Sequence, residues 1–298
     1  MPILLSPVPS SGGYRYEFVD RSGTVHDLTR DTSPRLFVTA GATGLGTPPT
    51  DVAADKLPFT AGSLVRHVAT QPRRIELPII IAESSISALV SQVDEVRDWF
   101  WAGDEQRRYS TYLRVTRPDG EIRQLQVFYT GGLDGDMVDG GPLHAQYVVS
   151  LLAPDPWPTA AGNDTASWLS TDGDLPTVSI INDGDLEAFP VWTITGPATS
   201  VNVNNTTTGK GWLYTSSLVG FNLASGKSLT IDTRFSPPRT GLPVVDSDGT
   251  SRFSSFHPAS SMFTLAPGQN DFTITFAGNS GATEIEVSWL PRYFGLLR

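Results

Sequence analysis

The stretch SLLAPDPWP, from Ser150 to Pro158, marks a change of structure in the middle of the chain. The residues before it alternate between apolar and polar side chains, as in a strand. Pro154, Pro156 and Pro158 then occupy every second position. Proline has no N–H for a sheet ladder and favours an extended residue before it. We therefore predict that a sheet ends here and that the chain leaves as a stiff arm carrying Trp157.

This proline-rich segment predicts a domain boundary, with an N-terminal domain at residues 1–157 and a C-terminal domain at residues 158–298. A chain of 298 residues is long enough for two ordinary domains, and its 39% hydrophobic content is typical of globular proteins. The net charge of −10 disfavours non-specific binding to DNA or to anionic lipid. The chain has no cysteine, which excludes disulfides, zinc–thiolate sites and cysteine nucleophiles.

Neither a signal peptide nor a membrane helix is indicated. The N-terminus has no basic region followed by an apolar stretch of signal length. No window approaches the roughly 20 apolar residues that a membrane helix needs. We expect a soluble protein that is made in the cytoplasm.

The N-terminal domain is predicted to be a β-barrel-like sheet with one helix. Ser84 or Ser85 can cap that helix, and Gly103 can end it. Its apolar positions recur at spacings of three and four and are expected to face the core: Ile86, Leu89, Val90, Val93, Val96 and Phe100. Trp99 and Trp101 flank Phe100, so the three rings cannot all face one core. The strands are expected at residues 14–18, 24–28, 34–40, 73–82, 109–116, 123–130 and 144–152.

The C-terminal domain shows short strand patterns separated by Gly, Asn and Pro, which favours a β-sandwich. Trp192, Trp212 and Tyr214 lie on such strands and are interpreted as core residues, with sugar-stacking platforms as the alternative. The expected strands are residues 178–181, 191–194, 200–204, 211–214, 228–232, 253–256, 271–276 and 284–289. The fold class is therefore mostly β (α+β).

Two loops in the N-terminal domain resemble ligand sites only superficially. Residues 41–58 begin with a glycine-rich run and are expected to form a long exposed loop, but the Gly-Lys-Ser/Thr of a phosphate loop is missing. Within the loop at residues 131–142, the stretch from Asp134 to Gly140 resembles a calcium loop, but the EF-hand spacing needs a carboxylate near position 145, where the chain has Ala145. With four scattered histidines and no catalytic motif, we expect no catalytic residue, no metal and no cofactor.

Several motifs, taken in order, resemble the siphophage distal tail protein (Dit) family over nearly the whole chain. The most specific is the strand ending Ala153-Pro154-Asp155-Pro156-Trp157. The others are Leu57-Pro58-Phe59-Thr60-Ala61-Gly62-Ser63, Pro72-Arg73-Arg74-Ile75-Glu76-Leu77-Pro78-Ile79, Ile181-Asn182-Asp183-Gly184, Phe189-Pro190-Val191-Trp192-Thr193-Ile194-Thr195-Gly196 and Leu265-Ala266-Pro267-Gly268-Gln269-Asn270.

The resemblance implies a structural protein of the phage tail tip, not an enzyme. Members form a ring, usually six-fold, that joins the tail tube protein to the tail-tip hub, with a galectin-like sandwich as a platform for peripheral fibres or receptor-binding proteins. The two long loops become candidate inter-subunit arms, since long loops outside a compact fold need a partner to order them. Their candidate residues are Gly41, Gly44, Gly46, Pro48, Asp134, Asp136 and Asp139.

The acidic charge suits a tube lumen through which DNA passes only as transiting cargo, because Lys and Arg contacts with phosphate are what make DNA binding tight. Two alternatives remain open. The sandwich could be a carbohydrate-binding module for host-wall glycans, or the chain could be another tail tube or minor tail component.

Overall fold

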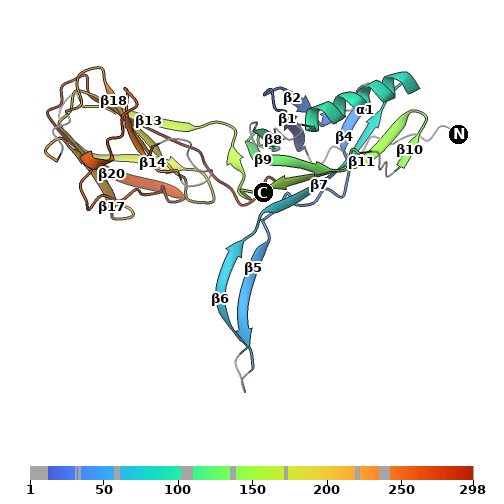
Figure 1. Cartoon of the computed structure of the whole chain (residues 1–298), viewed down its shortest axis with the longest axis horizontal. Helices are drawn as coiled ribbons and strands as arrows, with labels where there is room; N and C mark the ends of the chain where they lie inside the picture. Colours follow the sequence, from blue (N-terminus) through green and yellow to red (C-terminus); the bar gives the residue numbers. More distant parts are fainter. Residues whose placement is uncertain are drawn as a thin grey trace. The chain divides into compact units, whose positions relative to one another are not determined.

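The computed structural model describes residues 13–30, 32, 35–56, 61–101, 110–134, 139–170, 174–218, 222–234 and 242–297. The chain forms two compact units (Figure 1). Unit 1 comprises Met1–Ala161 and Phe294–Arg298, and unit 2 comprises Gly162–Tyr293. Unit 2 is thus inserted between two segments of unit 1. The fold is mostly β with one α-helix among the described residues.

Unit 1 is built on an antiparallel sheet of ten strands, in the order β2-β1-β8-β9-β11-β7-β4-β3, with β10 paired to β11 and β12 to β9. Its inward side chains alternate with outward ones, which is the pattern that the sequence predicted. Along β11 every second residue from Ala145 to Ala153 is buried. The strands are β1 Arg15–Val19, β2 Val25–Asp27, β3 Thr29–Arg30, β4 Arg35–Val38, β7 Arg73–Ala82, β8 Thr111–Thr116, β9 Ile122–Gly131, β10 Asp139–Gly141, β11 His144–Ala153 and β12 Thr159–Ala160.

The two sides of this sheet approach each other through Leu28, which lies between β2 and β3. Its N–H donates to the carbonyl of Tyr16 in β1 at 2.8 Å, and its carbonyl accepts from the N–H of Val38 in β4 at 2.9 Å. Leu28 itself is fully buried. The sheet therefore curves strongly around one apolar core, in keeping with the predicted barrel-like form.

Helix α1, Ile86–Phe100, packs against this sheet. Ser85 is its N-cap, and the Ser85 hydroxyl accepts from the N–H of Ala88 at 3.2 Å. The helix ends at Phe100 with Trp101 as C-cap, whereas the predicted stop at Gly103 lies outside the described residues. The prediction that Ile86 and Val90 face the core is wrong, because they lie on the flank of the helix and are 62% and 56% exposed.

The expected exposed loop at residues 41–58 is wrong for its second half. β5, Thr50–Lys56, pairs with β6, Ser63–Thr70, as a separate two-stranded sheet. We call this hairpin the arm, and it extends away from the rest of unit 1 (Figure 1). The sequence pattern missed it because its side chains are exposed on both faces, so no apolar face turns to a core.

The segment that follows unit 2 returns to the core of unit 1. Arg73, only 1% exposed, donates to the carbonyl of Phe294 at 3.1 Å, and Arg123, 5% exposed, donates to that of Gly295 at 2.8 Å. Leu296 is buried in the unit 1 core. Burial lowers the pKa of the Arg73 guanidinium to about 10, so Arg73 is still charged at neutral pH. Charged hydrogen bonds to carbonyls are the strong kind, and they fix this segment in place.

Unit 2 is a β-sandwich of a five-stranded sheet, β13-β21-β15-β18-β19, and a four-stranded sheet, β14-β20-β16-β17. Side chains from both sheets form one core. Residues 253–256, predicted as a strand, instead begin with a short 3₁₀ turn, η2 Phe253–Ser255. The strands are β13 Asp164–Leu169, β14 Leu175–Asn182, β15 Val191–Thr195, β16 Ser200–Asn205, β17 Lys210–Thr215, β18 Ser228–Asp232, β19 Val244–Asp246, β20 Gly268–Ala277 and β21 Glu284–Trp289.

Candidate interaction surfaces

The arm has one aliphatic face, which its strand register creates. Val52 pairs with Val68 and Ala54 pairs with Val65, and cross-strand partners point to the same face. Val65 and Val68 are three residues apart and would face opposite ways in a regular strand. The register shift between Ala53 and Ala54 adds a residue to β6 and brings both valines to one side.

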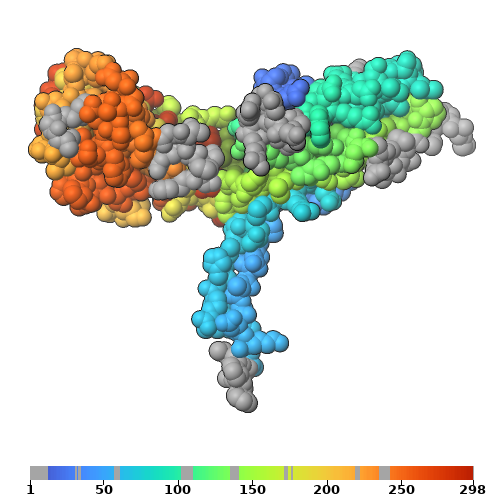
Figure 2. Space-filling view, viewed as in Figure 1, coloured from blue at the N-terminus to red at the C-terminus, as the bar shows by residue number. Residues whose placement is uncertain are grey.

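These valines are uncovered in the chain. Val52, Val65 and Val68 are 52%, 54% and 58% exposed, and the arm stands clear of the rest of unit 1 in the space-filling view (Figure 2). The opposite face, which we call the polar face, carries Asp51, Asp55 and His67, with Ala53, Leu64 and Ala69 as their strand partners. A two-faced hairpin with an exposed aliphatic side is typical of a segment that packs on another surface.

The glycine-rich run before the arm is bound to the sheet and is not a free loop. Arg73 donates to the carbonyls of Gly44 and Gly46 at 3.2 and 2.6 Å. Gly44 has φ +77°, and a Cβ there would lie 2.0 Å from the carbonyl oxygen of Arg74. The backbone of this run thus holds the base of the arm to the sheet, and its predicted role as an inter-subunit element stays a prediction. Gly41 and Pro48 flank the anchored part in the same segment.

The second loop that the sequence predicts as an inter-subunit contact, residues 131–142, is only partly described. Asp139 pairs with Gln146 at the start of β10, so this end is a hairpin strand. Asp134 is exposed, and Asp136 lies outside the described residues. The role of this segment as a contact with another subunit stays a prediction.

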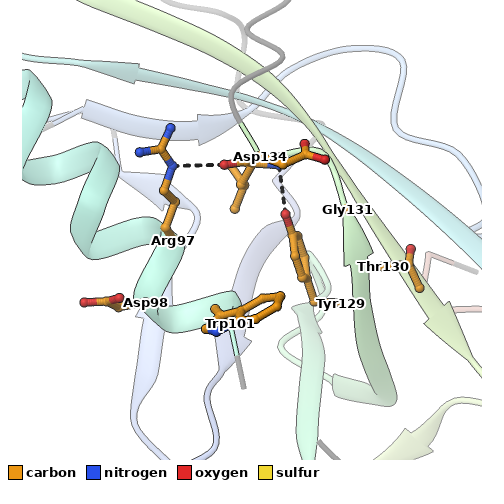
Figure 3. Close-up of a pocket in the computed structure, with 8 residues that line it drawn as sticks. Arg97, Asp98, Trp101, Tyr129, Thr130, Gly131 and Asp134 are labelled. Carbon is orange, nitrogen blue, oxygen red and sulfur yellow. Dashed lines mark hydrogen bonds between the residues drawn. The ribbon is translucent and has the colours of Figure 1, made fainter. Parts of the chain in front are cut away.

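A pocket of about 400 Å³ lies where α1 meets this segment (Figure 3). Trp101 forms an exposed wall, with 59% of its surface accessible, and its ring meets that of Tyr129 edge-on at 6.4 Å. The three neighbouring rings of Trp99, Phe100 and Trp101 point to different surroundings, as predicted. Phe100 is buried in the core, and Trp99 stacks on His26 at 4.0 Å. The lining residues are Arg97, Asp98, Trp101, Tyr129, Thr130, Gly131, Leu133 and Asp134.

Hydrogen bonds hold the floor of this pocket. Arg97 Nε donates to the carbonyl of Leu133 at 2.9 Å, and the Leu133 N–H donates to the Tyr129 hydroxyl at 2.9 Å. Arg97 also pairs with Asp94 at 3.1 Å. Burial, with a smaller effect from the carboxylate of Asp134, raises the pKa of the Tyr129 hydroxyl, so it stays protonated at neutral pH. Asp98 and Asp134 are the remaining charged groups at the rim.

The alternative of a sugar platform on the sandwich is wrong for the residues named. Trp192, Trp212 and Tyr214 are 0%, 1% and 0% exposed and lie in the unit 2 core. Trp192 packs edge-on against Trp212 at 5.8 Å. No ring face of the three is available to stack on a sugar, because each faces neighbouring core side chains.

Within the described part of the chain, no three His, Cys, Asp or Glu side chains gather as metal ligands. No described helix is long and apolar enough to cross a membrane. Among the described residues, the arm exposes aliphatic side chains and the helix-end pocket exposes an aromatic ring beside two carboxylates.

Comparison with known proteins agrees with the fold. Residues 183–293, all within unit 2, match the family described as "Siphovirus-type tail component, C-terminal domain". A search of curated proteins finds no similar sequence. The crystal structure of the Dit protein of phage SPP1, described as a paradigm of the hub adsorption apparatus in phages infecting Gram-positive bacteria, superposes with a TM-score of 0.64. That match has 12% identity and covers 93% of this chain and 98% of that chain.

Chains of the phage P2 baseplate in its activated conformation also match, more weakly. The calcium form has a TM-score of 0.49 and 9% identity and covers 93% of this chain and 98% of that chain. The strontium form has a TM-score of 0.48 and 9% identity and covers 92% and 97%. The family match in unit 2 and the SPP1 Dit fold over nearly the whole chain agree with the motifs found in the sequence. Residues 183–293 therefore match the C-terminal domain of a siphovirus-type tail component, and the chain as a whole has the fold of the SPP1 Dit protein.

Proposed function

We propose that this protein forms a ring, usually six-fold in the family, that joins the tail tube to the tail-tip hub of a long-tailed phage. In this role it is a structural protein of the virion, without catalytic activity. Unit 1 builds the ring, and unit 2 is a peripheral domain available to fibres or receptor-binding proteins.

The observation that carries this proposal is the uncovered aliphatic face of the arm. Three valines more than half exposed on a hairpin that has no core of its own are costly to leave in water. A ring closed by identical contacts needs two different patches on each subunit, and a projecting arm supplies one of them. In this proposal the arm is the inter-subunit element, and the glycine-rich run joins it to the sheet.

The lumen of such a ring would have to let DNA pass. The net charge of −10 favours an acidic lumen, because repulsion between carboxylates and phosphates prevents tight binding. An electron cryomicroscopy map of the assembled ring tests this point, and a lumen lined with Lys and Arg would contradict it.

The direct test is the mass of the purified protein by light scattering, with negative-stain images. We expect a closed ring of about six copies. The double variant Val52→Asp/Val68→Asp should remain monomeric, since it places charge on the aliphatic face. The matched control Ala53→Asp, on the opposite face of β5, should still form rings.

A chain that stays monomeric at every concentration, with or without tail tube protein as a template, would contradict the proposal. An open filament in place of a closed ring would favour the tail tube alternative.

A further inference from the structure

The helix-end pocket has the chemistry of a site for a cationic side chain. Trp101 and Tyr129 supply aromatic walls, and Asp98 and Asp134 place carboxylates at the rim. Arg97 is the one base in the lining and offsets these two carboxylates only in part, because it also pairs with Asp94 at 3.1 Å. No ion pair joins Asp98 or Asp134 to a base within the described ranges. A long aliphatic side chain that ends in a positive charge could pack against the two aromatic rings and pair with the carboxylates at the rim.

The arm carries such a side chain at the end of its aliphatic face. Lys56 lies two residues after Ala54 in β5, and therefore points to the same side as Val52. It is exposed, and it is one of only three lysines in the chain, with Lys210 and Lys227. The aliphatic face of the arm thus ends in a positive charge, while Asp51 and Asp55 point to the other face.

The two surfaces also match in length. Val52 and Lys56 are four residues apart in β5, which is about 13 Å at the rise of a strand. Val90, exposed on the flank of α1, and Trp101 are eleven residues apart, which is about 16 Å at the rise of a helix. An arm lying along this flank could therefore cover Val90 with its valines while Lys56 reaches the pocket.

We propose that the arm of one copy docks on the α1 flank of the next copy, with Lys56 in the pocket between Trp101, Tyr129, Asp98 and Asp134. This inference rests on the proposed ring and names its second patch. The valines bury Ile86 and Val90, and the polar face of the arm stays in water. The contact is heterologous, as ring closure requires.

A charge exchange tests the ion pair. Lys56→Asp should raise the protein concentration needed for half-assembly about tenfold, because it places a third carboxylate at the rim. Asp98→Lys alone should weaken assembly similarly, and the double variant should restore most of it. Lys210→Asp, a lysine of unit 2, is the matched control and should assemble as the wild type does. All four variants should keep the wild-type unfolding midpoint, since the exchanged groups are exposed.

Disulfide trapping tests whether the arm lies on the α1 flank of the neighbouring copy. The chain has no cysteine of its own, so every crosslink must come from the introduced cysteines. A Val68→Cys chain mixed with a Val90→Cys chain should give a crosslinked dimer on a non-reducing gel. Ala53→Cys, on the polar face of the arm, should not crosslink to Val90→Cys.

The outcomes separate the two proposals. Rings that form normally with Lys56→Asp, and that give no crosslink between the two positions, would overturn the docking and leave the ring intact. A crosslink that forms within one chain carrying both cysteines, but never between mixed chains, would place the arm on its own helix and also overturn it. A wild-type chain that never assembles would overturn the proposed function, and the docking with it.

Discussion

Two antiparallel strand pairs in unit 1 have the same hydrogen-bonding pattern and opposite surroundings. β7 pairs with β11 along their whole lengths, and the inward side chains of both strands are buried. β5 pairs with β6 nearly as completely, and every side chain of β5 is exposed. Backbone pairing is thus similar in the two places, whereas burial differs completely.

The difference shows what each pair contributes. Burial of apolar surface supplies most of the stability of a sheet, and an isolated two-stranded hairpin is marginal in water. The β7–β11 pair therefore stabilises unit 1, while the arm adds little to the monomer and exposes valines to a partner. Substitutions in the two regions should separate stability from assembly.

The largest contrast is expected from one substitution made in both regions. Leu77→Ala in β7 removes a side chain that is fully buried, and should lower the free energy of unfolding by about 2–5 kcal/mol. Leu64→Ala in β6, where the leucine is 48% exposed, should change it by less than about 0.5 kcal/mol. Urea denaturation measures both. Equal losses would mean that the arm is part of the unit 1 core.

A second prediction compares the stability lost when each of two adjacent arginines at the start of β7 is replaced. Arg73 is buried and donates to the carbonyls of Gly44, Gly46 and Phe294, whereas Arg74 is exposed. Arg73→Leu should cost about 2–4 kcal/mol, since three part-buried carbonyl acceptors lose a charged donor. Arg74→Leu should cost less than about 0.5 kcal/mol.

Arg73→Leu should also release the segment after unit 2. Limited proteolysis followed by mass spectrometry should find new cleavage near Phe294 in this variant and none in Arg74→Leu. Unchanged protection at Phe294 would show that the segment is held by its apolar contacts alone.

Much of this fold could be predicted where burial leaves a pattern in the sequence. The alternation in residues 144–152 and the three- and four-residue spacing from Leu89 to Phe100 both come from packing against one core. The prolines after Ala153 mark the end of β11 for a purely local reason, the missing N–H. Trp192 and Trp212 were correctly assigned to the core on the same grounds.

The interaction surfaces left no such pattern. The arm has exposed side chains on both faces, so its valines do not alternate with a buried set, and its bulge breaks the period at Val65. The helix-end pocket joins Trp101 to Tyr129 and Asp134, which only the three-dimensional fold brings together. The anchoring of Phe294 by Arg73 spans 221 positions and has no local signal.

A smaller loss of stability is expected from substitutions at the β1–β2 turn, where groups of the same hairpin supply the hydrogen bonds to Asp20. Burial raises the pKa of the Asp20 carboxyl, but hydrogen bonds from His26, from the Ser22 hydroxyl and from the N–H groups of Ser22 and Thr24 outweigh it and hold the pKa at about 2. A pKa lowered by folding stabilises the protein above the unfolded value of about 4. That contribution is lost as the pH falls from about 4 through about 2.

Asp20→Asn should therefore lower the free energy of unfolding by about 1–2 kcal/mol at pH 6, and the difference from wild type should vanish near pH 2. Ser22→Ala, which removes one donor, should give a smaller loss with the same pH dependence. Urea midpoints at pH 6, 4, 3 and 2 measure both. A difference that stays constant with pH would exclude the Asp20 charge as its source.

The smallest loss of stability is expected from a substitution on the arm. Arg66 pairs with Asp55 at 2.6 Å, but the two side chains are 64% and 59% exposed. An ion pair in water contributes only about 0–0.5 kcal/mol, and salt screens it. Arg66→Ala should therefore leave the urea midpoint within error at both low and high salt, in contrast to Arg73→Leu. If Arg66→Ala lowered the free energy of unfolding of the monomer by more than about 1 kcal/mol, the arm would have to be stabilised by contacts within its own chain, and its valines would not be free to cover the helix of a neighbour.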